Sequence, residues 1–184
     1  MQTLLAQASK SIPKEIAVGA NECRLARQGE RLVARGVLAD VVVTIQVPLA
    51  GFAAMLRFSA PPEKAVSRQR LEALWSFADQ ALELLFQSIR SMDIPSKEIV
   101  VSAMGGADLP AHTFGRGKQL ALVVQESIGR HGVVLNGKDL GGAQSRLIWL
   151  ESASGRLIVR AKSPAPSVAV NVKSSQATQR HKVS

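Results

Sequence analysis

The side chains that most often perform chemistry are scarce and scattered in this sequence. Cys23 is the single cysteine, and a thiol becomes a nucleophile only when a base lies within hydrogen-bond reach. It stands between Glu22 and Arg24 in a segment with the alternation of a β-strand, and no histidine is near it in the sequence. We therefore predict a structural thiol. A single cysteine also excludes an internal disulfide and cysteine-rich zinc sites.

The other usual chemical groups form no recognisable constellation either. Three histidines stand far apart in the sequence: His112, His131 and His181. They predict no ligand cluster, so we expect no metal. Glycine pairs at 105–106 and 141–142 lack the spacing of phosphate-binding loops. We therefore predict no nucleotide and no other cofactor.

Strands must position whatever site exists in the first third of the chain. Alternating residues begin at about 22, and β-branched residues dominate 37–45. Pro48 and Gly51 interrupt this run before 52–58 resumes it, which predicts two strands joined by a short connection. Asp40 and Arg57 would then lie near the ends of neighbouring strands.

A helix and further strands follow. Between residues 67 and 92, apolar residues recur at spacings of three and four: Leu71, Leu74, Trp75, Ala78, Leu82, Leu85, Phe86 and Ile89. This stripe predicts an amphipathic helix whose aromatic residues pack in a core and do not stack on a ligand. A second helix is predicted over 118–129. Strands are predicted over 98–103 and 133–135, with turns at both glycine pairs, and over 146–150 and 157–160 as a hairpin. The intermixed elements predict an α/β fold: one layered domain of mixed β-sheet with two main helices.

Composition divides the chain into three parts. Hydrophobic residues make up 46% and charged residues 20%, a balance that excludes a wholly disordered chain. We assign 1–20 to an N-terminal extension, 21–161 to the domain and 162–184 to a basic disordered tail. The tail holds no acidic residue and four cations: Lys162, Lys173, Arg180 and Lys182. The net charge is +9, so subtracting these four leaves +5 on the remainder.

Five segments in one order resemble the chemoreceptor glutamine deamidase family, CheD. They are LVARGVLADVVVTIQVP, AAMLRFSAP, SAMGGADL, GRHGVVLNGKDLGGAQSRLIWL and SASGRLIVR. The resemblance as a whole runs from about residue 22 to 160. The resemblance includes two turn motifs, built from Gly105, Gly106, Asp139, Gly141 and Gly142. It departs at 115–118, which reads Gly-Arg-Gly-Lys where the family has Arg-Asn. It implies a CheD-like fold of the cysteine-hydrolase type.

The resemblance also implies a mechanism whose residues are all replaced here. Family members use a cysteine nucleophile, a histidine base and a threonine to deamidate receptor glutamines. Without a gap, these positions fall on Asp40, Arg57 and Ala34, with the family separation of 17 kept between the first two. Arg57 stays protonated and cannot shuttle a proton. We therefore expect no catalytic residues and a structural ion pair between Asp40 and Arg57.

Three functions remain open at this point. The first is a catalytically degenerate CheD-like protein that binds chemoreceptor cytoplasmic helices or a CheC-type phosphatase, the partners implied by the resemblance. The second is residual protein-glutamine deamidation, and the third is nucleic-acid binding, prompted by a pI near 10.5. Aromatic residues are only 4%, so nucleic acid is disfavoured. No apolar run reaches the roughly 18 residues of a membrane span, and no secretory signal is recognisable, so we expect a cytoplasmic protein without membrane insertion.

Overall fold

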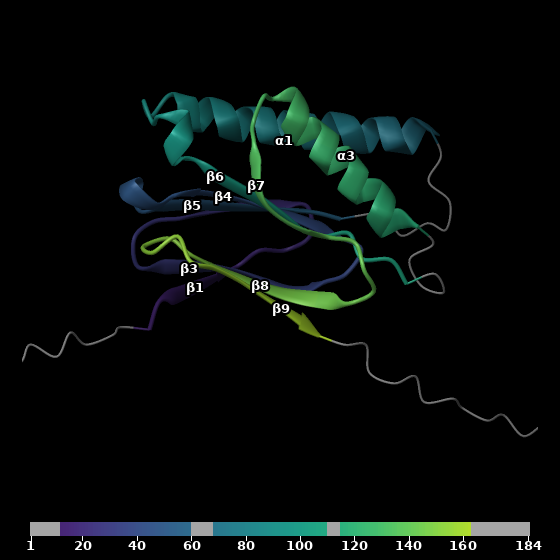
Figure 1. Cartoon of the computed structure of the whole chain (residues 1–184), viewed down its shortest axis with the longest axis horizontal. Helices are drawn as coiled ribbons and strands as arrows, with labels where there is room; N and C mark the ends of the chain where they lie inside the picture. The colour runs from purple at the N-terminus through teal and green to yellow at the C-terminus, as the bar shows by residue number, and fades with distance from the viewer. Residues whose placement is uncertain (1–11, 60–67, 110–114, 163–184) are drawn as a thin grey trace, which may run out of the picture.

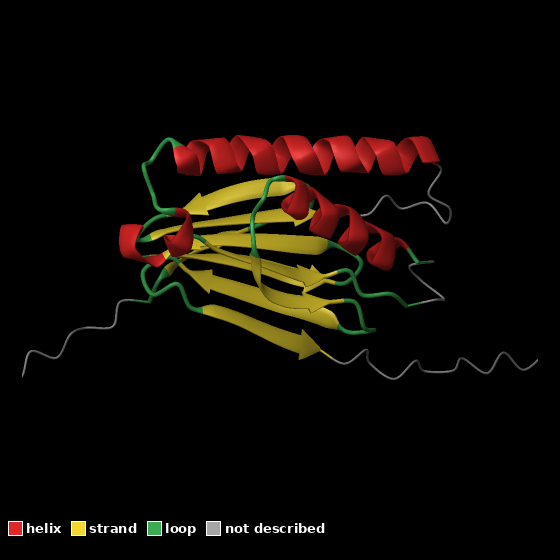
Figure 2. Cartoon of the chain, turned by 45° about the horizontal axis from the view of Figure 1, so that its top comes forward, coloured by secondary structure: helices red, strands yellow, loops and turns green. Residues whose placement is uncertain are grey.

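The computed structural model describes residues 12–59, 68–109 and 115–162, and the helices cover one side of two stacked β-sheets (Figures 1 and 2). The strands are β1 (Lys14–Ala17), β2 (Glu22–Ala26), β3 (Glu30–Val37), β4 (Val41–Val47), β5 (Phe52–Phe58), β6 (Val100–Gly105), β7 (Leu135–Leu140), β8 (Ser145–Glu151) and β9 (Leu157–Lys162). The helices are α1 (Arg68–Arg90) and α3 (Arg116–Arg130), with short 3-10 turns η1 (Pro48–Ala50) and η2 (Ser96–Glu98). The predicted mixed α/β class with two main helices is confirmed.

The strands divide between two sheets, a separation that the sequence did not predict. One sheet has the order β1-β3-β8-β9 and the other the order β2-β5-β4-β6-β7. Each is mixed, because β1 pairs with β3 and β6 with β7 in parallel, whereas the other pairs are antiparallel. Helices α1 and α3 cover the outer face of the five-stranded sheet (Figure 2). The outer face of the four-stranded sheet is not covered by a described helix.

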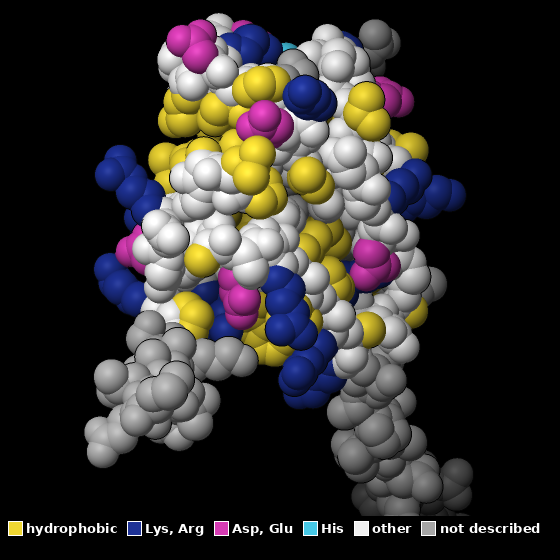
Figure 3. Space-filling model, turned by 60° about the vertical axis from the view of Figure 1, so that its left-hand side comes forward, with side chains coloured by type: hydrophobic (Ala, Val, Ile, Leu, Met, Phe, Trp, Pro, Cys, Tyr) yellow, Lys and Arg dark blue, Asp and Glu magenta, His cyan; other side chains and the backbone are white. Residues whose placement is uncertain are grey.

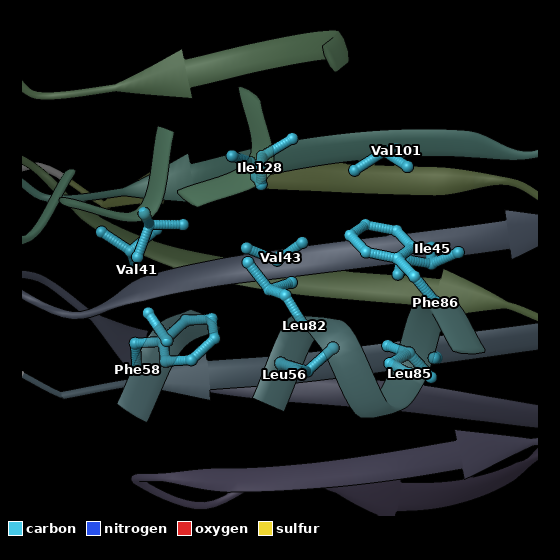
Figure 4. Close-up of a cluster of buried hydrophobic side chains, with 14 of the residues drawn as sticks. Val41, Val43, Ile45, Leu56, Phe58, Leu82, Leu85, Phe86, Val101 and Ile128 are labelled. Atoms are coloured by element: carbon cyan, nitrogen blue, oxygen red, sulfur yellow. The ribbon is translucent and has the colours of Figure 1, made fainter. Parts of the chain in front are cut away.

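Two apolar layers hold these elements together. The layer between the helices and the five-stranded sheet contains Val43, Ile45, Leu56, Leu82 and Phe86 (Figure 4). The layer between the two sheets contains Leu32, Val42, Met55, Ile148 and Leu150. Strand β4 is buried along its whole length because it contributes side chains to both layers, which explains its nearly continuous apolar sequence.

The predicted helical stripe is confirmed where its side chains are described. Ala78, Leu82 and Ile89 are at most 1% exposed and face the sheet. The side chains of Leu71, Leu74 and Trp75 lie outside the described part, as do Pro61-Pro62, His112 and His181. None of the described helices combines the length and the hydropathy that crossing a membrane requires.

Several boundaries differ from those expected. Strand β1 lies within residues 1–20, which the sequence set apart as an extension, because Lys14–Ala17 pairs with β3. The run over 37–45 does not form one strand, since the chain bends at 38–40 between β3 and β4. The turn expected at 139–142 begins only at Gly141, because Asp139 and Leu140 pair with β6 as the end of β7. Strand β9 reaches Lys162, the first residue assigned to the tail.

Charge is distributed over the surface without one dominant patch at the end of the molecule shown in Figure 3. Hydrophobic side chains gather in its upper and middle parts. Lys and Arg side chains lie around them with Asp and Glu interspersed. Charges of both signs are therefore mixed on this end of the fold.

Candidate functional site

Asp40 and Arg57 meet at one corner of the molecule. Arg57 donates to the same Asp40 oxygen through two nitrogens, with Nε to Oδ2 at 2.7 Å and Nη2 to Oδ2 at 2.5 Å. Both side chains are largely covered, with 19% of Asp40 and 14% of Arg57 exposed. Charge-assisted hydrogen bonds of this length are among the stronger ones in proteins. The two positions that the resemblance gives to a nucleophile and its base are thus joined as an ion pair.

The antiparallel register of β4 and β5 creates this contact. Val42 lies opposite Arg57 and Val41 opposite Phe58, so the residue immediately before β4 reaches the end of β5. Leu56 and Phe58 face the helices. Alternation therefore turns Arg57 to the other face, toward the interior between the sheets. There its Nη1 also donates to the carbonyl oxygen of Arg35 at 3.0 Å, which leaves the guanidinium tied to both β3 and the β3–β4 bend.

The first glycine pair clamps the bend that carries Asp40. The backbone N–H of Gly106 donates to the Asp40 carbonyl, and that of Ala107 donates to the Leu38 carbonyl, both at 2.7 Å. Gly105 has φ +114°, and a Cβ on it would come within 2.1 Å of the Asp40 carbonyl oxygen. A side chain larger than hydrogen is sterically incompatible with this approach. The pair thus makes a close backbone contact, and Gly105 belongs to the end of β6 and not to the predicted turn.

The second glycine pair extends the same corner. Gly141 N–H donates to the Gly105 carbonyl, and Asp108 N–H donates to the Gly142 carbonyl, both at 2.8 Å. All the turn residues named by the resemblance therefore belong to one connected set of backbone contacts around the Asp40 bend. This convergence joins parts of the chain that are about a hundred residues apart.

Arg146 completes this set, and no pattern in the sequence indicated its role. Its Nε and Nη2 donate to the two carboxylate oxygens of Asp139, each at 2.9 Å. It also donates to the carbonyls of Gly141 and Gln144. Hydrogen bonds from Arg146 lower the pKa of Asp139. An arginine at the start of an amphipathic strand normally lies on the solvent-exposed face. The side chain of Arg146 is instead more than nine tenths buried, and only this burial shows that Arg146 has a structural role.

The third position of the family mechanism holds no hydroxyl. Ala34 is fully buried in the layer between the sheets, directly before a register irregularity in the β3–β8 pairing. A methyl group can neither donate nor accept a hydrogen bond. Nothing at this position can therefore orient a base.

The only thiol lies on a different face. Cys23 is opposite Leu56 in the β2–β5 pairing, so its side chain is on the helix side of the sheet, whereas Arg57 points to the other side. The residue is exposed, yet partial burial of its sulfur raises the pKa of the thiol. A higher pKa reduces the thiolate fraction. Cys23 therefore cannot replace the nucleophile at the Asp40 corner in this arrangement.

His131 is also remote from the corner. It follows α3, where its Nδ1 is 2.9 Å from Glu83 and its ring lies against Phe86. The described corner thus contains a carboxylate, a guanidinium and backbone amides but neither a thiol nor an imidazole. In the described residues, no group of three or more His, Cys, Asp or Glu side chains is arranged to hold a metal ion. These groups can form a rigid polar contact, but they do not constitute an acid–base pair.

Comparisons with known proteins agree with the resemblance. Residues 61–161 match the family model described as CheD chemotactic sensory transduction. A probable chemoreceptor glutamine deamidase CheD of Solibacter usitatus is 28% identical over 147 residues, which cover 78% of this chain and 87% of that protein. CheD 2 of Anaeromyxobacter dehalogenans, also named a probable chemoreceptor glutamine deamidase, is 32% identical over 111 residues, covering 58% and 68% respectively. The corresponding protein of Haloarcula marismortui is 23% identical over 154 residues, covering 82% and 87%.

Proposed function

This chain belongs to the CheD family, and we propose that it is a catalytically degenerate member that acts in chemotaxis by binding. Its partners would be the cytoplasmic helices of chemoreceptors, a CheC-type phosphatase, or both. The relatives are named chemoreceptor glutamine deamidases, which supports a chemoreceptor as the first partner to test. Such a role places the protein in the cytoplasm, where these helices are.

The ion pair between Asp40 and Arg57 carries the proposal. Amide hydrolysis by this family requires a thiolate and a base that accepts and returns a proton. Asp40 is a weak nucleophile toward an unactivated amide, and the Arg57 guanidinium holds its proton at any accessible pH. Both hydrogen bonds from Arg57 end on Asp40 Oδ2. The ion pair that replaces the reactive cysteine and histidine also ties the β3–β4 bend to β5. The fold can therefore be retained although the groups needed for amide hydrolysis are missing.

Charge favours an acidic protein partner. The chain carries +9, and an acidic surface on a receptor or phosphatase would accelerate its association with this protein. Charge at the rim of an interface changes association rates more than affinity, and the attraction weakens as salt is added. We therefore expect binding whose association rate falls as the ionic strength rises.

A mass measurement tests the loss of catalysis. The full chain would be incubated with the cytoplasmic fragment of a chemoreceptor encoded in the same genome, and the fragment analysed for conversion of glutamine to glutamate. We expect no conversion by the wild-type protein. An active CheD from another organism, assayed with the same fragment, shows that the substrate is competent. Conversion by the wild type that disappears in an Asp40→Ala variant would overturn the proposal.

A binding measurement tests the remaining role. Biolayer interferometry with the same receptor fragment, and separately with a CheC-type phosphatase, should detect reversible association with at least one of them. The association rate should fall with increasing salt. Absence of binding to both partners at low salt, under conditions where an active CheD binds, would contradict the proposal even if no deamidation is seen.

A further inference from the structure

The edge strands of the two sheets differ in charge. In the described residues, β1 and β9 are the edges of one sheet, and β2 and β7 are the edges of the other. Strands β1, β2 and β7 each contain one acidic and one basic residue, whereas β9 contains two bases, Arg160 and Lys162, and no acid. An edge strand presents unpaired backbone N–H and C=O groups. Among the described edge strands, β9 is therefore the one whose side chains carry charge of a single sign, so it can favour a partner strand of the opposite charge.

Both cations lie on the outer face of the four-stranded sheet. Leu157 and Val159 pack into the layer between the sheets, so the alternate residues of β9 point the other way. Arg160 lies over the ring of Trp149, with its guanidinium carbon 5.1 Å from the ring centroid. Both Arg160 and Lys162 are exposed. Neither forms an ion pair with a carboxylate of the described residues.

The other half of this face is electrically balanced. On β3, Arg31 pairs with Glu15 and Glu151, and Arg35 pairs with Glu15. No acidic side chain in the described part of the chain pairs with Arg160 or Lys162 in this way. Beyond Lys162 the sequence continues to residue 184 with Lys173, Arg180, Lys182 and no acidic residue. Among the described residues, the unbalanced positive charge of this face is thus concentrated along β9.

We propose that the outer edge of β9 pairs with an extended acidic segment of a partner polypeptide. Arg160 and Lys162 are two residues apart on one face of the strand, a separation of about 7 Å. A partner strand with carboxylates at every second residue would place them beside these two cations as cross-strand pairs. Backbone hydrogen bonds to the open edge would supply affinity, and the charge pattern would supply selectivity. This surface is separate from the Asp40 corner and goes beyond the proposed function.

The same observations disfavour two other occupants. A second copy of the chain paired through its own β9 would bring Arg160 and Lys162 against like charges, and such pairs are destabilising. Single-stranded nucleic acid needs open aromatic faces on which bases stack. Trp149 is the only aromatic residue of β8 and β9, and Arg160 lies over its ring. An acidic peptide needs no such face.

Fluorescence anisotropy on the full chain tests the pairing. The probe is a labelled nine-residue peptide in which Glu alternates with Thr, and its partner probe has Gln in place of each Glu. We expect the Glu peptide to bind and the Gln peptide to bind at least about tenfold more weakly. In the double variant Arg160→Gln and Lys162→Gln, affinity for the Glu peptide should also fall by about tenfold, a change equivalent to roughly 1.4 kcal/mol. The matched control is Lys97→Gln with Lys118→Gln, which removes two exposed cations elsewhere and should leave the affinity within about twofold.

A second probe separates strand pairing from simple charge attraction. Methylation of alternate backbone nitrogens on one edge of the Glu peptide removes hydrogen-bond donors without changing its charge, so binding should be lost when the methylated edge faces β9. Equal binding by the methylated and unmodified peptides would overturn the proposal. Equal loss in the Lys97 and Lys118 control would overturn it as well. So would tighter binding of a single-stranded oligonucleotide that depends on Arg160 and Lys162, because it would assign the surface to nucleic acid.

Discussion

Two carboxylate–guanidinium pairs lie in the same network of glycine contacts, yet they are built differently. Arg57 directs two nitrogens to one oxygen of Asp40, whereas Arg146 spans both oxygens of Asp139. Asp40 is 19% exposed and Asp139 is 51% exposed. Arg146 also binds two carbonyl groups of the adjacent turn. The first pair is a largely covered contact with a single shared acceptor atom, and the second is a bidentate contact that closes a turn at the surface.

The difference indicates what each pair does for the fold. Asp40 depends on Arg57 because a covered carboxylate has little access to water. Asp139 can be hydrated if Arg146 is lost, and the main loss would then be the donors to the turn carbonyls. The pair at the replaced family positions should therefore matter more for stability than the better-shaped pair beside it. Four measurements test this ranking of the two pairs, and they follow in decreasing order of expected effect.

The largest effect is expected at the glycine that touches the Asp40 bend. A Cβ in Gly105→Ala would meet the Asp40 carbonyl oxygen at 2.1 Å, so the bend must move, and we expect a loss of about 3 to 5 kcal/mol. The matched control is Gly141→Ala, which also has positive φ but no atom within 4 Å of the added Cβ. It should cost only about 1 to 2 kcal/mol. Urea unfolding would measure both, and equal losses would show that the bend is not tightly clamped.

Removal of Arg57 should have the next largest effect. Arg57→Met leaves the Asp40 carboxylate without its cation, and we expect a loss of about 2 to 3 kcal/mol. The double variant Asp40→Asn with Arg57→Met should recover part of this loss, because it removes the unpaired charge. Thermal and urea unfolding of the four proteins form a double-mutant cycle. A coupling energy near zero would contradict a structural role for the pair.

Removal of Arg146 should cost less than removal of Arg57. In Arg146→Met the Asp139 carboxylate can turn to water, while the Gly141 and Gln144 carbonyls lose a donor. We expect a loss of about 1 to 2 kcal/mol, measured by urea unfolding at neutral pH. If this variant proves less stable than Arg57→Met, the ranking of the two pairs is wrong.

The smallest effect is the pH dependence of the second pair. Hydrogen bonds from Arg146 lower the pKa of Asp139 from its ordinary 3.8, so the folded state keeps this carboxylate ionised to lower pH than the unfolded state. The stabilisation is therefore present above the ordinary value and is lost as the pH falls through the folded pKa. Because Asp139 is half exposed, we expect less than about 1 kcal/mol. The stability difference between wild type and Asp139→Asn, followed by urea unfolding as the pH is lowered below 6, should decrease, and a constant difference would exclude this linkage.

Much of the local structure could be predicted because it depends on neighbouring residues. Apolar spacing located α1, and the β-branched run with Pro48 and Gly51 located β4, β5 and their connection. The strand β1 escaped notice, since its four residues mix charged and apolar types without a clear pattern. The division into two sheets also escaped, because alternation shows which residues of a strand are buried but not which sheet the strand joins.

The order and spacing of segments in the sequence alone predict that Asp40, Arg57 and Ala34 stand where the CheD resemblance puts a cysteine, a histidine and a threonine. The sequence also predicted that Asp40 lies near Arg57, since two strands joined by a short connection form an antiparallel pair. The three-dimensional structure was needed to show that Gly105 lies against the Asp40 carbonyl and that Arg146 binds Asp139. It was also needed to show that β9 is an edge strand of the four-stranded sheet. These contacts join distant segments, and their geometry depends on packing across sheets that no local pattern specifies.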